Sequence, residues 1–133
     1  MIQVKIDTKE KFTVVEPLDA YIYDNMAADL AATCSKFLQE PVKNLILNLQ
    51  KVNGIDTPVA TQIATLQQQF YEQNASFVIC CIQPAVEDIF EKEELLDFIN
   101  FTPTESEAWD IVQMEEIERE LLDSNDINFD IEE

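Results

Sequence analysis

Runs of apolar residues divide this chain into short strands separated by helical segments. Residues 2–6 alternate between apolar and polar, which is typical of a half-buried strand, and residues 12–15 form a second apolar run. A short polar turn separates the two runs, so we expect an N-terminal hairpin. Residues 42–49 and 76–82 are more continuously apolar, which predicts two strands buried on both faces at the centre of a parallel sheet.

Between these runs, apolar residues recur every three or four positions, as they do on one face of a helix. Such segments cover about residues 24–39, 58–72, the stretch that follows Gln83, and residues 104–122. The order β-β-α-β-α-β-α-β-α predicts an α/β fold, with a mixed four- to five-stranded sheet, parallel central strands and about four helices. In the last helix we expect six apolar residues to point inward: Ala108, Ile111, Val112, Met114, Ile117 and Leu121.

The stretch from residue 44 to residue 70 joins a buried strand to a helix through a loop that holds the only glycine of the chain, Gly54. Thr57 suits the N-cap of that helix, because its hydroxyl can accept a hydrogen bond from a free first-turn N–H. Pro58 then suits the first helical position, and Asp56 reads as an acid that complements the helix dipole. The stretch places one hydroxyl at the positive end of a helix, where we expect the functional site.

The length and the charge of the chain limit the functions that it can have. The 133 residues suit one domain, expected at residues 1–122, followed by an acidic and disordered tail at residues 123–133. The net charge of −19 disfavours binding to nucleic acid or to anionic lipid, and it favours a basic protein partner or simply solubility. No apolar run is long enough to span a membrane and no export signal opens the sequence, so we expect a cytoplasmic protein.

The sequence offers little for catalysis. It has no histidine, and its three cysteines, Cys34, Cys80 and Cys81, have no spacing that suits a disulfide framework or a metal site. Both common nucleotide-binding glycine motifs are missing, so no cofactor is expected. An enzyme that uses Asp56 and Thr57 is disfavoured, because no neighbouring residue could act as a base near neutral pH.

Several short segments, taken in order, resemble those of STAS domains, the fold of bacterial anti-sigma factor antagonists and of the cytoplasmic tails of sulfate transporters. The resemblance covers about residues 12–112. It rests on LDA at 18–20, ILNLQKV at 46–52, GIDT at 54–57, QPAV at 83–86 and TPTESEA at 102–108.

The resemblance implies a non-enzymatic regulatory domain that binds a protein partner, either an anti-sigma factor of the serine/threonine kinase type or a phosphatase. In that family the first or the second hydroxyl after an aspartate is phosphorylated, depending on the member, and phosphorylation releases the partner. Carried over, Asp56 matches the aspartate and Thr57 the first hydroxyl. Pro58 replaces the second hydroxyl, Val59 replaces a glycine and Asn48 replaces an aspartate at the strand end.

Three interpretations of this segment therefore stand side by side. Thr57 is a phosphorylated switch, or it only caps its helix, or the domain is a fixed scaffold subunit of a transport or signalling complex. For the first, we expect the partner to bind a surface that includes Asn53, Gly54, Asp56, Thr57, Pro58, Thr61, Gln62 and Thr65.

Overall fold

The structure, a computed structural model, describes residues 2–132 and the side chains of residues 2–121. The strands are β1 (Val4–Thr8), β2 (Thr13–Pro17), β3 (Tyr21–Ile22), β4 (Leu45–Asn48), β5 (Gly54–Ile55), β6 (Phe77–Cys80) and β7 (Phe101–Thr102). The α-helices are α1 (Ala27–Ser35), α2 (Thr57–Glu72), α3 (Pro84–Lys92) and α4 (Glu105–Glu132), and the 3-10 turns are η1 (Asp24–Met26), η2 (Lys36–Gln39) and η3 (Leu96–Phe98).

Five strands form one mixed sheet in the order β1-β2-β4-β6-β7. The β1–β2 hairpin is antiparallel and lies at one edge, and the other strand pairs are parallel. The strands β4 and β6 pair in the centre, with Leu45 opposite Phe77 and Asn48 opposite Cys80. The predicted fold class, the central parallel pair and the edge hairpin are confirmed. A second, two-stranded sheet joins β3 to β5 and was not predicted.

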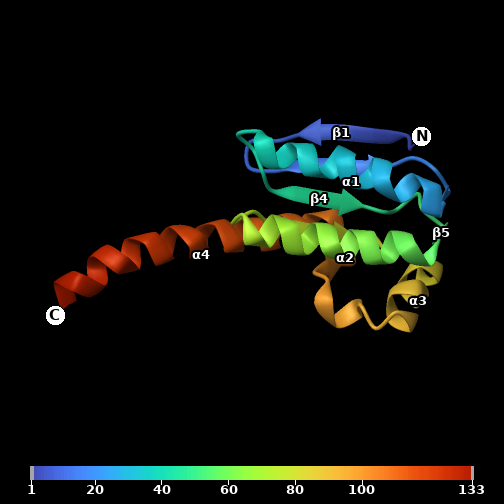
Figure 1. The fold of residues 1–133 in the computed structure, drawn as a ribbon. Helices are drawn as coiled ribbons and strands as arrows, with labels where there is room; N and C mark the ends of the chain where they lie inside the picture. The colour runs from blue at the N-terminus through green and yellow to red at the C-terminus, as the bar shows by residue number, and fades with distance from the viewer. Residues whose placement is uncertain (1, 133) are drawn as a thin grey trace.

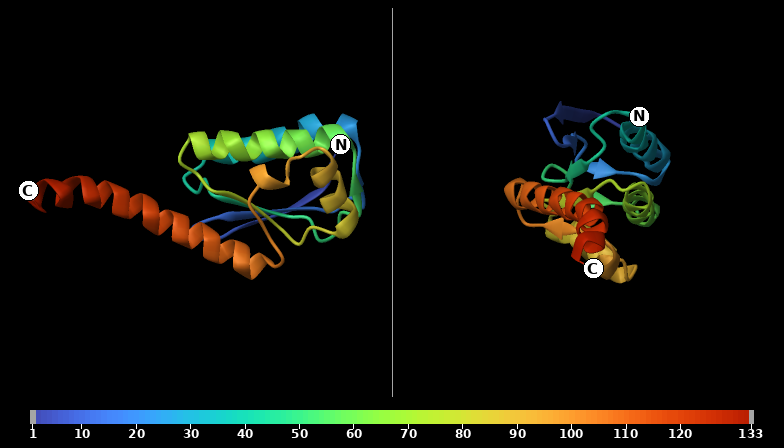
Figure 2. Two further views of the ribbon diagram at one scale, coloured as in Figure 1. Left: turned by 90° about the horizontal axis from the view of Figure 1, so that it is seen from below. Right: turned by 90° about the vertical axis from the view of Figure 1, so that its left-hand side faces the viewer.

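Helices cover both faces of the sheet (Figures 1 and 2). Leu45 and Leu47 of β4 point to the face that packs against α1, α2 and α3, whereas Ile46 points to the face covered by α4. This alternation follows from the two-residue period of a strand. Because both faces are covered, the central strands β4 and β6 are apolar on both sides up to Asn48 at the end of β4, which explains their continuous hydrophobic runs.

The attachment of α4 differs from the prediction. Ala108 and Val112 are fully buried against the sheet, but Met114, Ile117 and Leu121 are 60 %, 55 % and 53 % exposed. The expectation that these three residues point inward is wrong. The sheet face under α4 is short, and only side chains that share the face of Ala108 and Val112 reach it.

Polar contacts, and not apolar ones, extend the attachment of α4 by two further turns. Glu115 accepts hydrogen bonds from the Ser76 hydroxyl at 2.5 Å and from the Tyr71 hydroxyl at 2.8 Å. Arg119 donates to Ser76 Oγ at 3.0 Å and to Asn44 Oδ1 at 3.2 Å. Beyond these contacts α4 continues to Glu132 and projects away from the body (Figure 2). The predicted domain end at residue 122, with a disordered tail at 123–133, stays a prediction.

Candidate functional site

The start of α2 lies one residue earlier than the sequence suggested. Asp56 is the N-cap, with extended backbone angles of φ −77° and ψ 152°, and Thr57 and Pro58 are the first two helical residues. No side chain caps the helix at Asp56. The predictions of Thr57 as N-cap and of Pro58 at the first helical position are therefore wrong by one residue, and Asp56 is not a first-turn acid.

The carboxylate of Asp56 binds the segment that precedes α1. Its Oδ1 accepts a 2.8 Å hydrogen bond from the Tyr21 hydroxyl, and its Oδ2 accepts a 2.7 Å bond from the Asp24 backbone N–H. The Asp56 N–H donates in turn to the Ile22 carbonyl at 3.0 Å. These three bonds, together with the β3–β5 pairing, hold the beginning of α2 against the connector between β2 and α1. Asp56 is thus an organising residue of the site, and its carboxylate is already engaged.

Tyr21 explains why the only glycine of the chain stands at position 54. A Cβ atom added to Gly54 would lie 2.8 Å from Cε2 of Tyr21 and 2.9 Å from its Cδ2, closer than a real Cβ contact. The ring of Tyr21 lies over this gap and stacks at a tilt with Tyr23, with centroids 4.6 Å apart. The hydrogen bond to Asp56 raises the pKa of the Tyr21 phenol above its ordinary value, so that the phenol stays a donor. Gly54 is buried and leaves room for the Tyr21 ring. It therefore has no exposed side chain with which to contact a partner.

Asn48, at the end of β4, ties the loop before α2 to α4. Its Oδ1 accepts a hydrogen bond from the Gln50 N–H at 2.9 Å, and its Nδ2 donates to Oε1 of Glu105 at 2.9 Å. An aspartate in this place would lack the amide donor and would face a second carboxylate. The asparagine that departs from the family pattern therefore fits the presence of Glu105 in this chain.

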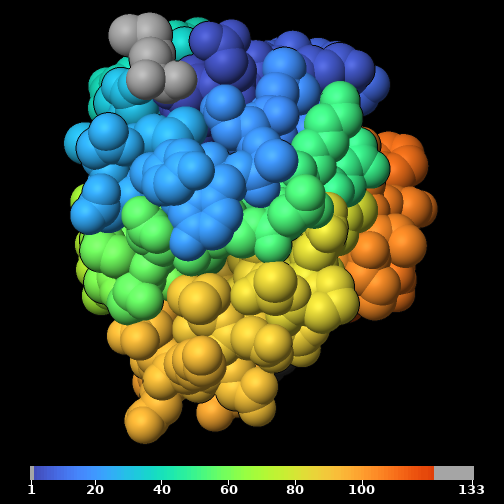
Figure 3. Space-filling model, turned by 90° about the vertical axis from the view of Figure 1, so that its right-hand side faces the viewer, coloured from blue at the N-terminus to red at the C-terminus, as the bar shows by residue number. Residues whose placement is uncertain are grey.

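The predicted partner-binding residues of α2 form a line on its solvent side. Thr57, Pro58, Thr61 and Thr65 are exposed and Gln62 is partly exposed, whereas Val59 and Ile63 of the same helix are fully buried. Figure 3 looks onto the end of the molecule where residues of the early 20s, the 50s and the 80s lie next to one another. We call the exposed surface at this end the α2 surface, formed by Tyr21, Tyr23, Asn53, Thr57, Pro58, Thr61, Gln62 and Thr65.

Sequence reasoning missed the two tyrosines of the α2 surface. Tyr21 and Tyr23 are 38 % and 56 % exposed, which is high for aromatic residues, and aromatic side chains are enriched at protein interfaces. The only sequence signal was the spacing of two tyrosines ahead of a helix. Their proximity to Thr57 depends on the β3–β5 pairing, which is set by tertiary contacts.

The sequence on either side of Thr57 offers no basic group that would receive a phosphate. Residues 52–91 include no lysine or arginine. Lys51, which precedes this range, has its Nζ 3.8 Å from Oε2 of Glu16, at the side of the loop. A phosphoryl group on Thr57 would instead lie next to the acidic side chain of Asp56, the adjacent residue.

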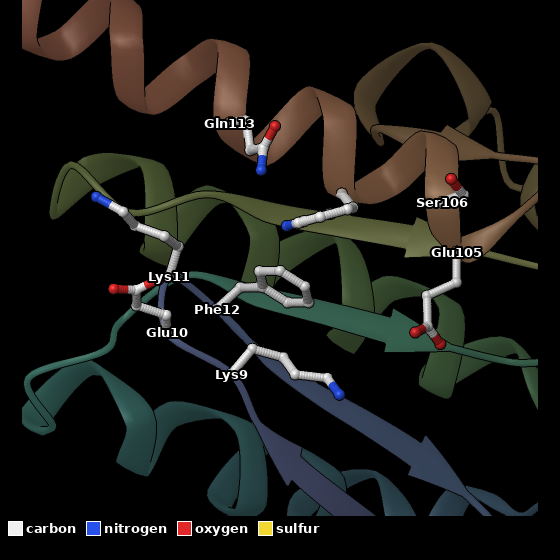
Figure 4. Close-up of a pocket in the computed structure, with 8 residues that line it drawn as sticks. Lys9, Glu10, Lys11, Phe12, Glu105, Ser106 and Gln113 are labelled. Carbon is white, nitrogen blue, oxygen red and sulfur yellow. The ribbon is translucent and has the colours of Figure 1, made fainter.

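The hollow drawn in Figure 4 lies apart from the α2 surface. It has a volume of about 570 Å³ and lies between the β1–β2 turn and α4. The Phe12 ring lies between Lys11 and Glu10 on one side and Glu105 on the other, and Trp109 contacts Phe12 with ring centroids 6.0 Å apart. The two lysines that line the hollow, Lys9 and Lys11, balance its two glutamates, Glu10 and Glu105, in charge. The charge of the lining therefore favours no class of ligand.

Among the residues that the structure describes, no group of three or more acidic, cysteine or histidine side chains is placed to hold a metal ion. No helix in the described part of the chain combines the length and the apolar character of a membrane span.

A mixed sheet with an edge hairpin, crossed by helices and carrying a hydroxyl at the start of the helix after β5, is the arrangement expected of the STAS fold. The family model of the STAS domain matches residues 3–108, and the chain belongs to this family. It is a regulatory binding domain of the STAS type and not an enzyme.

Solved structures agree with this assignment at the level of the fold. An anti-sigma factor antagonist from Mycobacterium paratuberculosis is 16 % identical, with a TM-score of 0.74 over 85 % of this chain and 95 % of that chain. The anti-sigma factor antagonist SpoIIAA in its unphosphorylated form is 17 % identical, with a TM-score of 0.67 over 85 % of this chain and 96 % of that chain.

SpoIIAA of Bacillus in its phosphorylated form has a TM-score of 0.61, with 17 % identity over 84 % of this chain and 99 % of that chain. A murine anion transporter, solute carrier 26 family member A9, matches 81 % of this chain with a TM-score of 0.65 and 15 % identity. The match covers only 18 % of the transporter, so this chain corresponds to a small part of that protein.

Proposed function

We propose that this STAS domain is a partner-switching regulator of the anti-sigma factor antagonist type, in which the α2 surface binds the partner and phosphorylation of Thr57 releases it. The partner is an anti-sigma factor of the serine/threonine kinase type, with a phosphatase to reverse the modification. The observation that carries this proposal is the exposed Thr57 at the first position of α2, on a surface with few charges.

Thr57 has the accessibility that a kinase needs. Its side chain is exposed at the end of the molecule, and the cap position is taken by Asp56. Modification of Thr57 would therefore cost no capping hydrogen bond and would leave α2 folded. The existence of a phosphorylated form of SpoIIAA, a structural neighbour, supports the proposal that a domain of this fold can be modified in this way.

The effect of a phosphate would fall on the partner and not on the fold. Phosphorylation adds about −1.5 to −2 charges near neutral pH. The free N–H groups of the first turn can accept part of this charge, but no lysine or arginine of residues 52–91 neutralises the rest. A partner that fits the uncharged surface formed by Tyr21, Thr57 and Thr61 would then have to desolvate a phosphate on binding.

A second candidate function is that of a scaffold without a switch. Pro58 and Val59 depart from the family pattern beside Thr57, and the match to 18 % of a murine anion transporter supports the occurrence of this fold within transport proteins. In this case the α2 surface holds a fixed partner and Thr57 is not modified.

Incubation with ATP and the serine/threonine kinase encoded nearest to the gene of this chain separates the two functions. Intact mass spectrometry of the parent protein and of Thr57→Ala reads out the modification. The switch predicts the mass of one phosphate on the parent and none on the variant. If the parent protein forms a complex with the kinase but gains no phosphate, the switch is ruled out and the scaffold function remains.

A further inference from the structure

The face of α4 that points away from the sheet carries an uncovered line of apolar side chains. Met114, Ile117 and Leu121 are 60 %, 55 % and 53 % exposed. Their spacings of three and four residues place them in one line along the helix. We call this line the α4 stripe. In many surface helices the exposed side is polar, so three large apolar side chains in a row point to a binding surface.

The orientation of the α4 stripe is fixed by the contacts on the opposite side of the helix. Ala108 and Val112 are buried against the sheet, and Glu115 and Arg119 hold the next two turns through Ser76. The helix cannot rotate the stripe inward without breaking these contacts. The stripe begins where α4 lies on the sheet and continues toward the part that projects from the body (Figure 2).

Carboxylates border the α4 stripe. Asp110, Glu118 and Glu120 are exposed on the same side of the helix. Arg119, the only basic residue after Lys92, is turned inward, with its Nε 3.6 Å from Oε1 of Glu116 and its guanidinium bound to Ser76. The surface offered to a partner is therefore apolar along its centre and negative along its edges.

We propose that the α4 stripe binds a basic amphipathic helix of a protein partner. The apolar side of such a helix would cover Met114, Ile117 and Leu121, and its lysine or arginine residues would lie beside the bordering carboxylates. Two helices packed at an interaxial distance of 8–10 Å bring flanking charges within reach of each other. This site is independent of the proposed function, because α4 and α2 cover opposite faces of the sheet.

A second copy of this chain fits the stripe less well. Two α4 helices packed stripe to stripe would place the carboxylates of Asp110, Glu118 and Glu120 against their equivalents, and like charges in such positions destabilise a pair of helices. A net charge of −19 on each copy adds a long-range repulsion. A basic partner gains from the same charges.

Binding of a fluorescent leucine–lysine peptide with helical periodicity, measured by anisotropy, tests the proposal on the full chain. The comparison peptide has the same composition, but its leucines and lysines alternate, so that it cannot form one apolar helical side. The stripe variant is Ile117→Gln with Leu121→Gln. The matched control is Ile6→Gln with Leu18→Gln, two residues that are each 41 % exposed and lie outside α4.

We expect the helical peptide to bind the parent about tenfold more tightly than the alternating peptide, and the stripe variant to lose this preference while the control variant keeps it. The variant Glu118→Gln with Glu120→Gln should weaken binding severalfold and reduce its dependence on salt. Equal affinity for both peptides, or a preference that survives in the stripe variant, would overturn the proposal. So would a dimer of the parent, seen by sedimentation equilibrium, that the stripe variant dissociates.

Discussion

The hydroxyl of Tyr21 lies 2.8 Å from Oδ1 of Asp56, and this bond fixes the start of α2 to a strand that stands 35 positions earlier in the chain. The same carboxylate accepts the Asp24 N–H at 2.7 Å. Asp56 therefore assembles the α2 surface from two distant segments. The residue that the family pattern suggests as a neighbour of the phosphorylation site has a structural task in this chain.

Replacement of Asp56 by alanine should destabilise the domain, because the Tyr21 hydroxyl and the Asp24 N–H both lose their acceptor. We expect the free energy of unfolding in urea to fall by about 1 kcal/mol, because both bonds are exposed and water can replace the lost acceptor. Tyr21→Phe removes one of the two bonds and should lower the free energy of unfolding by less than Asp56→Ala does. If Asp56→Ala were as stable as the parent, the carboxylate would not hold the connector, and the site would need another explanation.

Gly54→Ala should be destabilising although the new methyl group is small. The added Cβ would lie 2.8 Å from the Tyr21 ring, so the ring must shift and weaken its bond to Asp56. Overpacking of a closed core costs about 1–3 kcal/mol, and the cost here should lie at the low end because the Tyr21 ring is 38 % exposed and can shift. The control is the double variant Gly54→Ala with Tyr21→Ala, in which the methyl group meets no ring. A cost for Gly54→Ala that is the same with and without Tyr21 would contradict this account.

The anchoring of α4 predicts a contrast between two changes. Glu115→Ala removes the acceptor of the buried Ser76 hydroxyl and of the Tyr71 hydroxyl, and should lower the free energy of unfolding by about 2 kcal/mol. Truncation after Leu122 removes only residues beyond the anchoring contacts, and should change the thermal midpoint very little. A truncation that costs more than about 2 kcal/mol would mean that the tail docks on the domain.

Burial of Cys34 predicts a loss of stability in alkali. Burial raises the pKa of this thiol from 9.0 to about 12, so in the folded protein it stays protonated where the unfolded chain ionises. The contribution is fully present below pH 9 and is lost as the pH rises toward 12, with a limiting slope of about 1.4 kcal/mol per pH unit. Urea unfolding at several pH values should show a shallower decline for Cys34→Ala than for the parent. Identical slopes would show that the thiol is not shielded from solvent.

Sequence patterns were sufficient for the sheet, because two-sided burial of its central strands leaves continuous apolar runs. These patterns failed where tertiary contacts determine the local structure. Thr57 and Asp56 are both residue types that suit an N-cap. The start of α2 depends on the contacts of Asp56 with Tyr21 and Asp24, which are too distant in the sequence to be part of a local pattern. In α4, apolar spacing alone could not tell the buried line of Ala108 and Val112 from the exposed line of Met114 and Ile117.

Thr57 itself could be recognised from the sequence, since a hydroxyl after an aspartate at a predicted helix start is a local feature. The two tyrosines beside it could not, because the β3–β5 pairing involves only two residues in each strand. A strand of two residues is too short to show an alternation of apolar and polar positions in the sequence. The sequence therefore indicated the part of the candidate site that lies on α2, but not the part that Tyr21 and Tyr23 contribute from the segment between β2 and α1.

The most direct test of the proposed switch compares Thr57→Asp with Thr57→Asn, two side chains of nearly equal shape that differ in one charge. Because Asp56 and not Thr57 occupies the N-cap position of α2, both variants and Thr57→Ala should unfold within about 0.5 kcal/mol of the parent, which makes their binding comparable. The measurement is the dissociation constant for the partner anti-sigma factor by titration calorimetry. The account predicts that Thr57→Asn binds within about threefold of the parent and that Thr57→Asp binds at least about tenfold more weakly. Equal affinities of the two variants would contradict the claim that charge at Thr57 controls the α2 surface.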